Sequence, residues 1–459
     1  MRLHGIAAGL LLGIAALFAT LPTQAQEVLS HGRFRNVTVY TPKTEVRQVV
    51  LFLSGRDGWD EDMADMARTL MTQGTLVAGI NTPQLFSAFE ADDGDCATPS
   101  GDLDNLSRFI QAYYKLPTYR PPVLAGHAAA AGFAYAMLAQ APAGTFAGAL
   151  SLNFNPALAL NKPLCKGAGL LSTPRRHHGG ATLQPTQHLP APWVVLQPAQ
   201  IRGDAPAQAR TFISQVEGAE LIELPEGGPR DWRLQLITAF GKLAAQEKTQ
   251  ALPQPSLPDL PIVEVQAHGN TSKLFAVMLS GDGGWAGLDR EVAAALTARG
   301  VSVVGIDSLR YFWQARTPQG LADDLDRVLR YYAGRWQKSR ALLIGYLQGA
   351  DVLPFALNRL PAASRALVAQ TALLGIGNQA AFEFHLSNWV GKSGDHPILP
   401  EVRRWPANTA LCIYGAEEKD SPCPVAFASH TLPIRLTGGH HFNGDYDVLA
   451  RTILEHVPE

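Results

Sequence analysis

The chain has 459 residues, of which 46% are hydrophobic and 17% are charged, and its formal net charge is −2. This length exceeds one ordinary domain and predicts two domains of about 200 residues, each able to bury its own core. The small net charge supplies no basic face for a phosphate backbone, so nucleic-acid binding is excluded as a function.

Residues 1–25 have the pattern of a secretory signal. A basic start precedes an apolar run from Ile6 to Phe18, and small residues end at Ala25. The pattern predicts cleavage before Gln26 and export, most simply to a bacterial periplasm. The alternative is an uncleaved anchor helix, although the apolar run is short for a bilayer.

The four cysteines suit an oxidising compartment. We expect disulfides between Cys412 and Cys423 in the C-terminal half and between Cys96 and Cys165 in the N-terminal half. No C-x-x-C pair occurs, so neither zinc binding nor thiol exchange is expected, and no metal or other cofactor is predicted.

One order of segments occurs twice in the chain. A strand with a glycine-rich turn and a tryptophan is found at 48–59 and again at 274–285. Each copy is followed by a helical pattern, a second strand and an amphipathic helix: Met63–Gln73, Thr75–Asn81 and Asp102–Lys115 in the first half, and Leu288–Arg299, Val301–Asp307 and Leu321–Trp336 in the second. Strands that alternate with helices predict a mostly parallel sheet with flanking helices, here as a duplicated α/β domain.

The expected domains are 26–248 and 262–459, and the second begins with a strand at Ile262–Gln266. Between them, residues 249–261 form a proline-rich linker with restricted backbone freedom.

The segment Leu342–Asp351 reads as a strand, a sharp turn and a helix. Gly345 and Gly349 flank a central position at the spacing of the G-x-S-x-G nucleophile elbow. Here the central residue is Leu347, which has no nucleophilic atom, and the corresponding residue in the N-terminal half is Ala128. The sequence therefore predicts the strand–turn–helix elbow of a hydrolase in both halves, without the nucleophilic serine at its centre.

Candidates for the other two members of a hydrolase triad follow in the expected order, acid and then histidine. A late strand that ends at Gly415 is followed by Asp420, which we favour as the acid, with Glu418 as the second choice. Two glycines then precede His440 and His441, either of which could act as the base while the other packs or caps a helix. Surface acids on a solvated loop are the alternative reading of the carboxylates.

The glycine-rich loop that follows the apolar strand at 274–279 could form an oxyanion hole, because glycines leave backbone amides free to converge. The residues concerned are Asp282, Gly283, Gly284 and Trp285, together with the amide of Gln348. The alternatives are a tight strand-to-helix turn or an anion site at the helix N-terminus.

The N-terminal half has Gly228-Pro229 where the other half has Gly439-His440, so no triad is expected there. Its basic cluster at Pro174–His178 reads as a solvated loop, with contact to an acidic partner or a lipid headgroup as the alternative.

Five segments resemble the VirJ/AcvB family of periplasmic bacterial virulence proteins. They are Leu279–Trp285, Leu309–Trp313 together with Arg316–Pro318, Gly345–Phe355, Tyr414–Cys423 and Gly438–Asp445. The family has serine where this chain has Leu347, and the nearest hydroxyl groups in the sequence are those of Tyr346 and Ser280. The resemblance implies two tandem α/β-hydrolase domains after a signal peptide.

For AcvB-like members, the resemblance implies hydrolysis of aminoacyl-phosphatidylglycerol, such as lysyl- or alanyl-phosphatidylglycerol, at the periplasmic face of the inner membrane. For VirJ-like members it implies a chaperone or adaptor role in type IV secretion. Because Leu347 replaces the nucleophile, the expected functions are a lipid-ester hydrolase with very low activity, a pseudohydrolase that binds lipid or protein without turnover, and an adaptor for secretion components.

Overall fold

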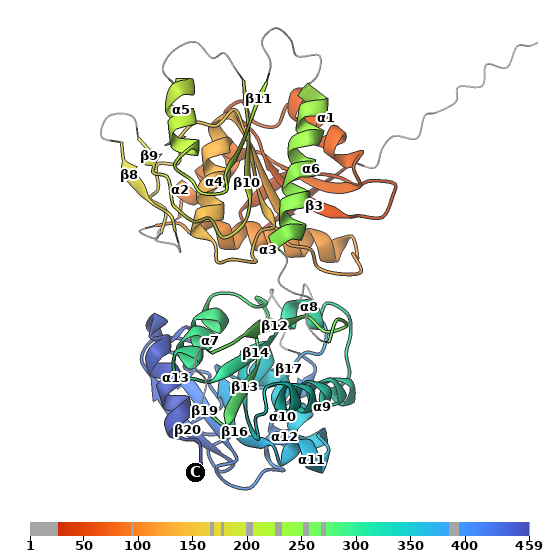
Figure 1. Cartoon of the computed structure of the whole chain (residues 1–459), viewed down its shortest axis with the longest axis vertical. Helices are drawn as coiled ribbons and strands as arrows, with labels where there is room; N and C mark the ends of the chain where they lie inside the picture. The colour runs from red at the N-terminus through yellow and green to blue at the C-terminus, as the bar shows by residue number, and fades with distance from the viewer. Residues whose placement is uncertain are drawn as a thin grey trace, which may run out of the picture.

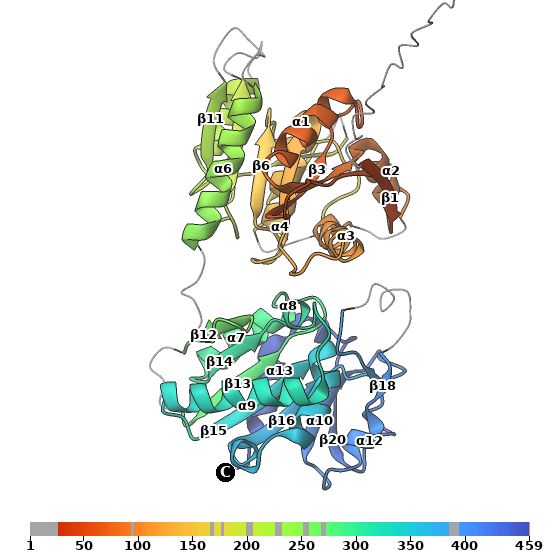
Figure 2. The ribbon, with the colours of Figure 1, turned by 90° about the vertical axis from the view of Figure 1, so that its right-hand side faces the viewer.

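The computed structural model describes residues 26–92, 96–165, 169–175, 179–198, 205–224, 232–250, 257–267, 272–384 and 394–458. These residues form two α/β domains, each built on one large, mostly parallel sheet with helices on both faces (Figures 1 and 2). The predicted fold class, two tandem α/β-hydrolase-like domains, is confirmed. None of the described helices is both long and apolar enough to cross a membrane. The predicted signal segment lies outside the described residues.

The N-terminal sheet has eight strands in the order β1-β2-β4-β3-β5-β6-β10-β11. They are β1 (Gln26–His31), β2 (Phe34–Tyr40), β3 (Gln48–Leu53), β4 (Thr75–Ile80), β5 (Val123–His127), β6 (Gly148–Leu152), β10 (Trp193–Pro198) and β11 (Glu220–Leu224). The strands from β4 to β11 in this order are parallel, whereas β1 and β2 pair antiparallel at one edge. A small antiparallel sheet is formed by β7 (Ala157–Leu158), β9 (Ala181–Leu183) and β8 (Ser172–Pro174).

Helices cover both faces of this sheet, and each face has its own apolar core. One core lies under α1 (Glu61–Met71) and α6 (Trp232–Gln250). The other lies under α2 (Thr82–Glu90), α3 (Pro99–Tyr113), α4 (Ala131–Gln140) and α5 (Ala205–Ile213). Helix α6 extends to Gln250, two residues into the predicted linker, and residues 251–256 of that linker lie outside the described part.

The C-terminal sheet has seven strands in the order β12-β14-β13-β15-β16-β19-β20. They are β12 (Ile262–Val265), β13 (Leu274–Leu279), β14 (Ser302–Ile306), β15 (Arg340–Tyr346), β16 (Val368–Leu374), β19 (Ala410–Gly415) and β20 (Thr431–Leu436). Only β12 pairs antiparallel among these seven. A separate short pair is formed by β17 (Gln379–Ala380) and β18 (His396–Pro397).

Helices again cover both faces of the C-terminal sheet. One apolar core lies under α7 (Leu288–Ala298) and α13 (Tyr446–Glu455). The other contains residues of α8 (Ser308–Tyr311), α9 (Pro318–Arg335), α10 (Gln348–Arg359) and α12 (Leu399–Val402), and α11 (Ala362–Arg365) follows α10.

The duplication is visible in matching local contacts. In the N-terminal domain, a Cβ added at Gly79 would lie 2.3 Å from the ring of Trp59. In the C-terminal domain, a Cβ added at Gly305 would lie 2.3 Å from the ring of Trp285. In each half the indole therefore occupies space that any other residue on the neighbouring strand would fill, which is why the turn carries a tryptophan and the second strand a glycine.

Both disulfides join the cysteine pairs named from the sequence. Cys96 is bonded to Cys165 with a Cα–Cα distance of 5.0 Å, and Cys412 to Cys423 with a distance of 5.5 Å. The second bridge closes a loop directly after β19, where the candidate acids stand.

Candidate functional site: an elbow without its nucleophile

The turn between β15 and α10 has the backbone of a nucleophile elbow. Leu347 has φ 45° and ψ −114°, a conformation that side chains rarely adopt. A Cβ at Gly345 would lie 2.5 Å from the carbonyl oxygen of Gly349, and one at Gly349 would lie 2.2 Å from that of Leu279. The two glycines are therefore required by close backbone packing.

The N-terminal domain repeats this turn between β5 and α4. Ala128 has φ 48°, and a Cβ at Gly126 would lie 2.2 Å from the carbonyl oxygen of Ala130. The strained turn is thus present in both halves, with an aliphatic residue at each centre.

Three side chains predicted or considered as site residues meet around Gly375, which follows β16 and has φ 59°. A Cβ added there would lie 3.2 Å from Cδ2 of Leu347, 3.4 Å from Cβ of His440 and 3.7 Å from Oε1 of Glu418. The structure therefore places the elbow residue, one histidine and one carboxylate in one small region. A side chain at position 375 would crowd all of them.

The carboxylate at this point belongs to Glu418. Its Oε2 accepts the N–H of Gly415, at the end of β19, with a length of 2.5 Å. Asp420, which the sequence analysis favoured, stands two residues further along the loop and is exposed to solvent. Of the two acids weighed from the sequence, the one held against the sheet is thus Glu418.

The two histidines have different neighbours. His440 is the one beside Leu347 at Gly375, whereas Nδ1 of His441 is hydrogen-bonded to the hydroxyl of Tyr346 at 3.2 Å. Burial, with a smaller contribution from His440, lowers the pKa of His441, and burial raises the pKa of Tyr346. Of the two histidines, His440 is thus the one whose Cβ lies beside the elbow residue at Gly375, and His441 is the one whose ring contacts Tyr346.

The predicted oxyanion loop adjoins the elbow. A Cβ at Gly281 would lie 3.1 Å from Cδ1 of Tyr346 and 3.7 Å from Cβ of Leu347. The loop is a tight turn in which the N–H of Gly284, at φ 76°, donates to the carbonyl of Gly281 at 3.0 Å. Trp285, included in the predicted oxyanion set, is buried against β14 and has a packing role.

Gln348 begins α10, so its backbone N–H belongs to the first turn of the helix and has no partner within the helix. Its side chain is mostly buried and donates from Nε2 to the carbonyl of Ala381 at 3.3 Å. The amide of Gln348 thus directly follows the elbow residue, and the glycine-rich loop adjoins the elbow through Gly281, the two segments from which an oxyanion hole would draw its donors.

A buried carboxylate that the sequence analysis did not single out supports the site. Asp351, on α10, accepts the N–H of Gly377 at 2.7 Å. Burial raises the pKa of Asp351 to about 7. The bond ties the loop that carries Gly375 to the helix that follows the elbow. Only its position next to the elbow could have drawn attention to Asp351, because nothing in the sequence marks it as buried.

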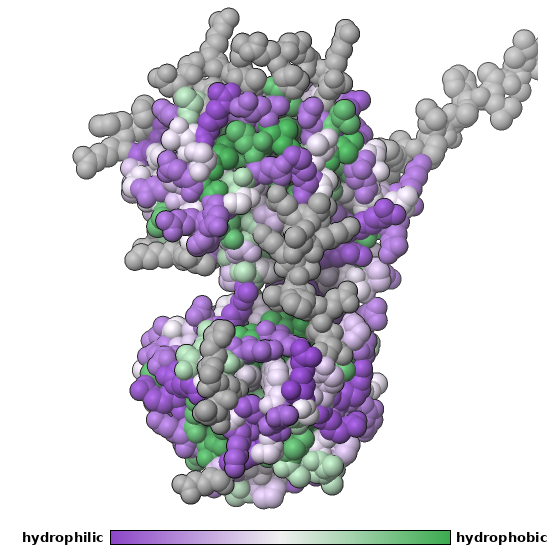
Figure 3. Space-filling model, in the orientation of Figure 1, coloured by the Kyte–Doolittle hydropathy of each residue, from purple (hydrophilic) through white to green (hydrophobic). Residues whose placement is uncertain are grey.

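The N-terminal domain keeps an apolar cavity of about 160 Å³ at the carboxyl ends of its strands. Its lining residues are Met66, His127, Leu152, Asn153, Leu196, Pro198, Leu224, Trp232 and Leu236. Burial lowers the pKa of His127, which precedes the elbow residue of this half. Figure 3 shows an apolar area on this domain.

Two further segments of the N-terminal half that the sequence analysis considered lie outside the described residues. They are Gly228-Pro229 and residues 176–178 of the basic cluster.

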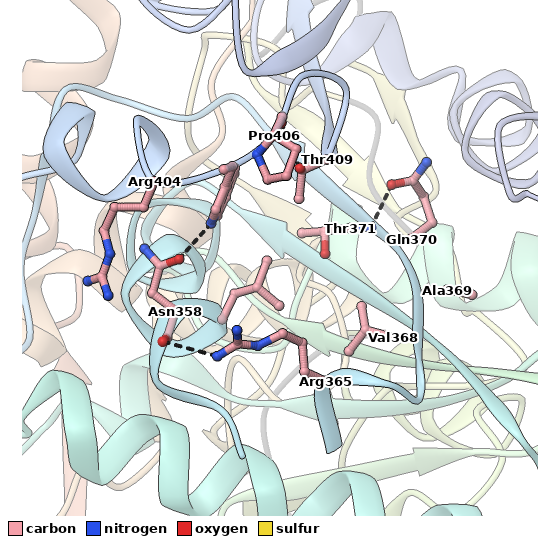
Figure 4. Close-up of a pocket in the computed structure, with 11 residues that line it drawn as sticks. Asn358, Arg365, Val368, Ala369, Gln370, Thr371, Arg404, Pro406 and Thr409 are labelled. Atoms are coloured by element: carbon pink, nitrogen blue, oxygen red, sulfur yellow. Dashed lines mark hydrogen bonds between the residues drawn. The ribbon is translucent and has the colours of Figure 1, made fainter. Parts of the chain in front are cut away.

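A larger cavity of about 210 Å³ lies at the other end of the C-terminal sheet (Figure 4). Residues 368–371, where β16 begins, line it, whereas the elbow packs against the end of β16. Arg365 and Trp405 both donate hydrogen bonds to Asn358 beside it. It is therefore separate from the elbow site. Within the described parts of the chain, no group of histidine, cysteine and acidic residues could hold a metal ion.

Comparison with known proteins supports the resemblance noted in the sequence. No curated protein matches the chain. Similar solved structures include Est1E from Butyrivibrio proteoclasticus with ferulic acid bound, at 14% identity over 44% of this chain and 96% of that one, with a TM-score of 0.33. MenH from S. aureus is 12% identical over 42% of this chain and 96% of that one, with a TM-score of 0.33. LpqC, a poly(3-hydroxybutyrate) depolymerase from Bordetella parapertussis, is 15% identical over 45% and 89%, with a TM-score of 0.31. Residues 273–459 match the family model of the bacterial virulence protein VirJ, so the C-terminal domain is similar to the VirJ family over that range.

Proposed function

We propose that the C-terminal site binds an ester ligand without turning it over. The observation that carries this proposal is Leu347, an aliphatic side chain held in the elbow conformation beside His440. An isobutyl group has no atom that can attack a carbonyl carbon, so the histidine has no nucleophile to activate. The frame of a serine hydrolase then serves as a binding site.

The ligand that we propose is an aminoacylated phospholipid, such as lysyl- or alanyl-phosphatidylglycerol, at the periplasmic face of the inner membrane. The resemblance to AcvB-like proteins supports this choice. The loop beside the elbow carries Glu417, Glu418 and Asp420, whose negative charge would attract the ammonium group of an aminoacyl ester. The oxyanion amides would receive the ester carbonyl.

Binding and turnover can be measured on the same vesicles. We expect the purified chain to float with vesicles that contain lysyl-phosphatidylglycerol more than with vesicles of phosphatidylglycerol alone. Release of lysine should stay close to the rate of protein-free vesicles, because the nucleophile is absent. Equal flotation with both vesicles would refute lipid recognition, and rapid lysine release would show that the chain is an active hydrolase.

A protein ligand is the second candidate, as the VirJ resemblance implies an adaptor linked to type IV secretion. One observation favours it: Val425, on the loop next to Cys423, is 84% exposed and offers an apolar contact. Val425→Asp should weaken capture of a protein ligand at this loop and leave flotation with lysyl-phosphatidylglycerol unchanged, so the two candidates are separated by measuring protein capture and flotation on the same variant.

We also propose export to the periplasm, where two disulfides would persist. Protein isolated from that compartment should begin near Gln26 and should show no reactive thiol before reduction, because all four cysteines are paired. N-terminal sequencing and thiol labelling test this together. A protein that keeps Met1 and reacts with the label without reduction would contradict the proposed location.

A further inference from the structure

An arginine of the N-terminal domain contacts the glycine-rich loop of the C-terminal domain. Figures 1 and 2 both place α3 on the side of its domain that faces α8. From α3, Arg108 donates through Nη1 to the carbonyl oxygen of Asp282 at 3.0 Å and through Nη2 to that of Gly283 at 2.6 Å. The arginine is only 8% exposed, so these contacts form away from bulk water.

Neighbouring groups fix the guanidinium of Arg108. It is paired with the carboxylate of Asp104 one turn earlier on α3, and Tyr119 donates to the same carboxylate at 2.8 Å. Tyr119 packs in turn against Trp313 of the C-terminal domain, with ring centroids 5.3 Å apart. Trp313 donates to the carbonyl of Leu116 at 2.7 Å, which closes the set of contacts around the arginine.

The direction of these hydrogen bonds determines the direction of the loop amides. No peptide bond among the described residues is cis, and in a trans peptide the C=O and the next N–H point in opposite directions. With the carbonyl of Asp282 turned toward Arg108, the N–H of Gly283 points away from it. The peptide between Gly283 and Gly284 is fixed in the same way, because its carbonyl oxygen accepts from Arg108. Its N–H, which belongs to Gly284, donates to the carbonyl of Gly281 within the turn.

The loop needs such a constraint because its own sequence is permissive. Three of its residues are glycines, which accept many backbone conformations at similar free energy. The loop also adjoins the elbow through Gly281. A bidentate contact from a buried arginine restricts two successive peptide planes beside the ligand site.

We propose that Arg108 is a positioning residue, through which the N-terminal domain holds the oxyanion loop of the C-terminal domain in a ligand-competent orientation. The N-terminal half has no reacting group of its own at Ala128. Through Arg108, it would instead orient the glycine-rich loop beside the C-terminal site. The inference rests on the proposed function only in what the oriented amides bind; the orientation itself is a property of the chain alone.

Hydrogen exchange of the full-length protein, followed by mass spectrometry, tests the orientation directly. In Arg108→Met, which keeps the length of the side chain but donates no hydrogen bond, amides within 281–287 should exchange at least about tenfold faster than in the unchanged chain. Arg108→Lys keeps the charge beside Asp104 but cannot reach both carbonyls, so a smaller increase is expected there. The melting temperature of each variant checks that the domains stay folded.

Gln314→Ala is the matched control, because Gln314 also donates across the domain interface, to the carbonyl of Pro117 at 2.9 Å, without touching the loop. Its loop should exchange as in the unchanged chain. An equal increase in Gln314→Ala would assign the effect to general loosening of the interface and overturn the proposal. Unchanged exchange in Arg108→Lys, the variant that best preserves the fold, would overturn it as well.

A second readout separates this inference from the proposed function. In the Leu347→Ser background, Arg108→Met should lower kcat about tenfold with a smaller effect on KM, since oxyanion amides act mainly on the transition state. If vesicle binding fails but loop exchange responds to Arg108, the positioning role stands and the proposed ligand is wrong. If the chain binds the vesicles but loop exchange does not respond to Arg108, the proposed ligand stands and the positioning role is wrong.

Discussion

Replacing Leu347 with serine is expected to raise the hydrolysis of aminoacyl-phosphatidylglycerol or of short acyl esters by at least about 10²-fold. The turn already has the required backbone, with φ 45° and ψ −114°, so a serine oxygen would stand where Leu347 now begins its side chain. His440 and Glu418 lie around the same point at Gly375. Initial rates of the purified variant and of the unchanged chain measure the gain.

Three further variants define its origin. Leu347→Ala removes the isobutyl group without supplying an oxygen, so it should gain nothing. Leu347→Ser combined with His440→Ala should lose the gain, whereas combination with His441→Ala should keep most of it, because His441 is bonded to Tyr346. The opposite result would make His441 the base. A well-folded but inactive Leu347→Ser protein would show that the site serves binding alone.

The second large effect concerns the acid. In the Leu347→Ser background, Glu418→Gln should reduce kcat about 10²-fold, because a triad carboxylate orients the histidine and stabilises its charged form. Glu418 is fixed to Gly415 at the end of β19. Asp420→Asn should change kcat little, since Asp420 is exposed.

Steady-state kinetics of the two acid variants, measured side by side, decide between them. Both substitutions are isosteric amides on one loop, so a general effect on loop stability would appear in each. If Asp420→Asn abolishes the activity and Glu418→Gln does not, the acid is Asp420, as the sequence analysis favoured, and the loop rearranges when the site works.

The elbow could be predicted from the sequence because its geometry depends on two glycines at a fixed spacing. Gly345 and Gly349 are constrained by backbone atoms less than 3 Å from their missing Cβ, so no other residue fits. The central residue is not constrained in the same way, and the turn forms with alanine or leucine there. The pattern of close contacts is therefore encoded locally, even where the chemistry is lost.

Helix boundaries were less well predicted. The apolar period predicts a helix from Leu321, whereas α9 starts at Pro318 behind Thr317, whose hydroxyl accepts the N–H of Gly320. A proline is compatible with the first turn of a helix, where its missing N–H has no partner to lose. Periodicity detects the buried face of a helix, and the first turn of α9 lies before that face begins.

The choice of acid and the role of Arg108 could not be derived from the sequence. Glu418 and Asp420 are two residues apart, and which of them reaches the sheet depends on how the loop closes after β19. Arg108 and the loop carbonyl of Asp282 are 174 residues apart in the chain. The contact between Arg108 and this carbonyl depends on how the two domains pack against each other, and no local sequence pattern predicts that packing.

The strained turns at Ala128 and Leu347 have a consequence for how this protein could change over evolutionary time. A backbone in such a conformation costs roughly 1–3 kcal/mol, and the surrounding glycine packing holds it whether or not a nucleophile is present. Loss of the reacting group therefore leaves the architecture intact and is reversible. The C-terminal half is one substitution away from a serine at its elbow, whereas the N-terminal half, with Ala128 at the elbow and Gly228-Pro229 where the other half has Gly439-His440, would need several coordinated changes.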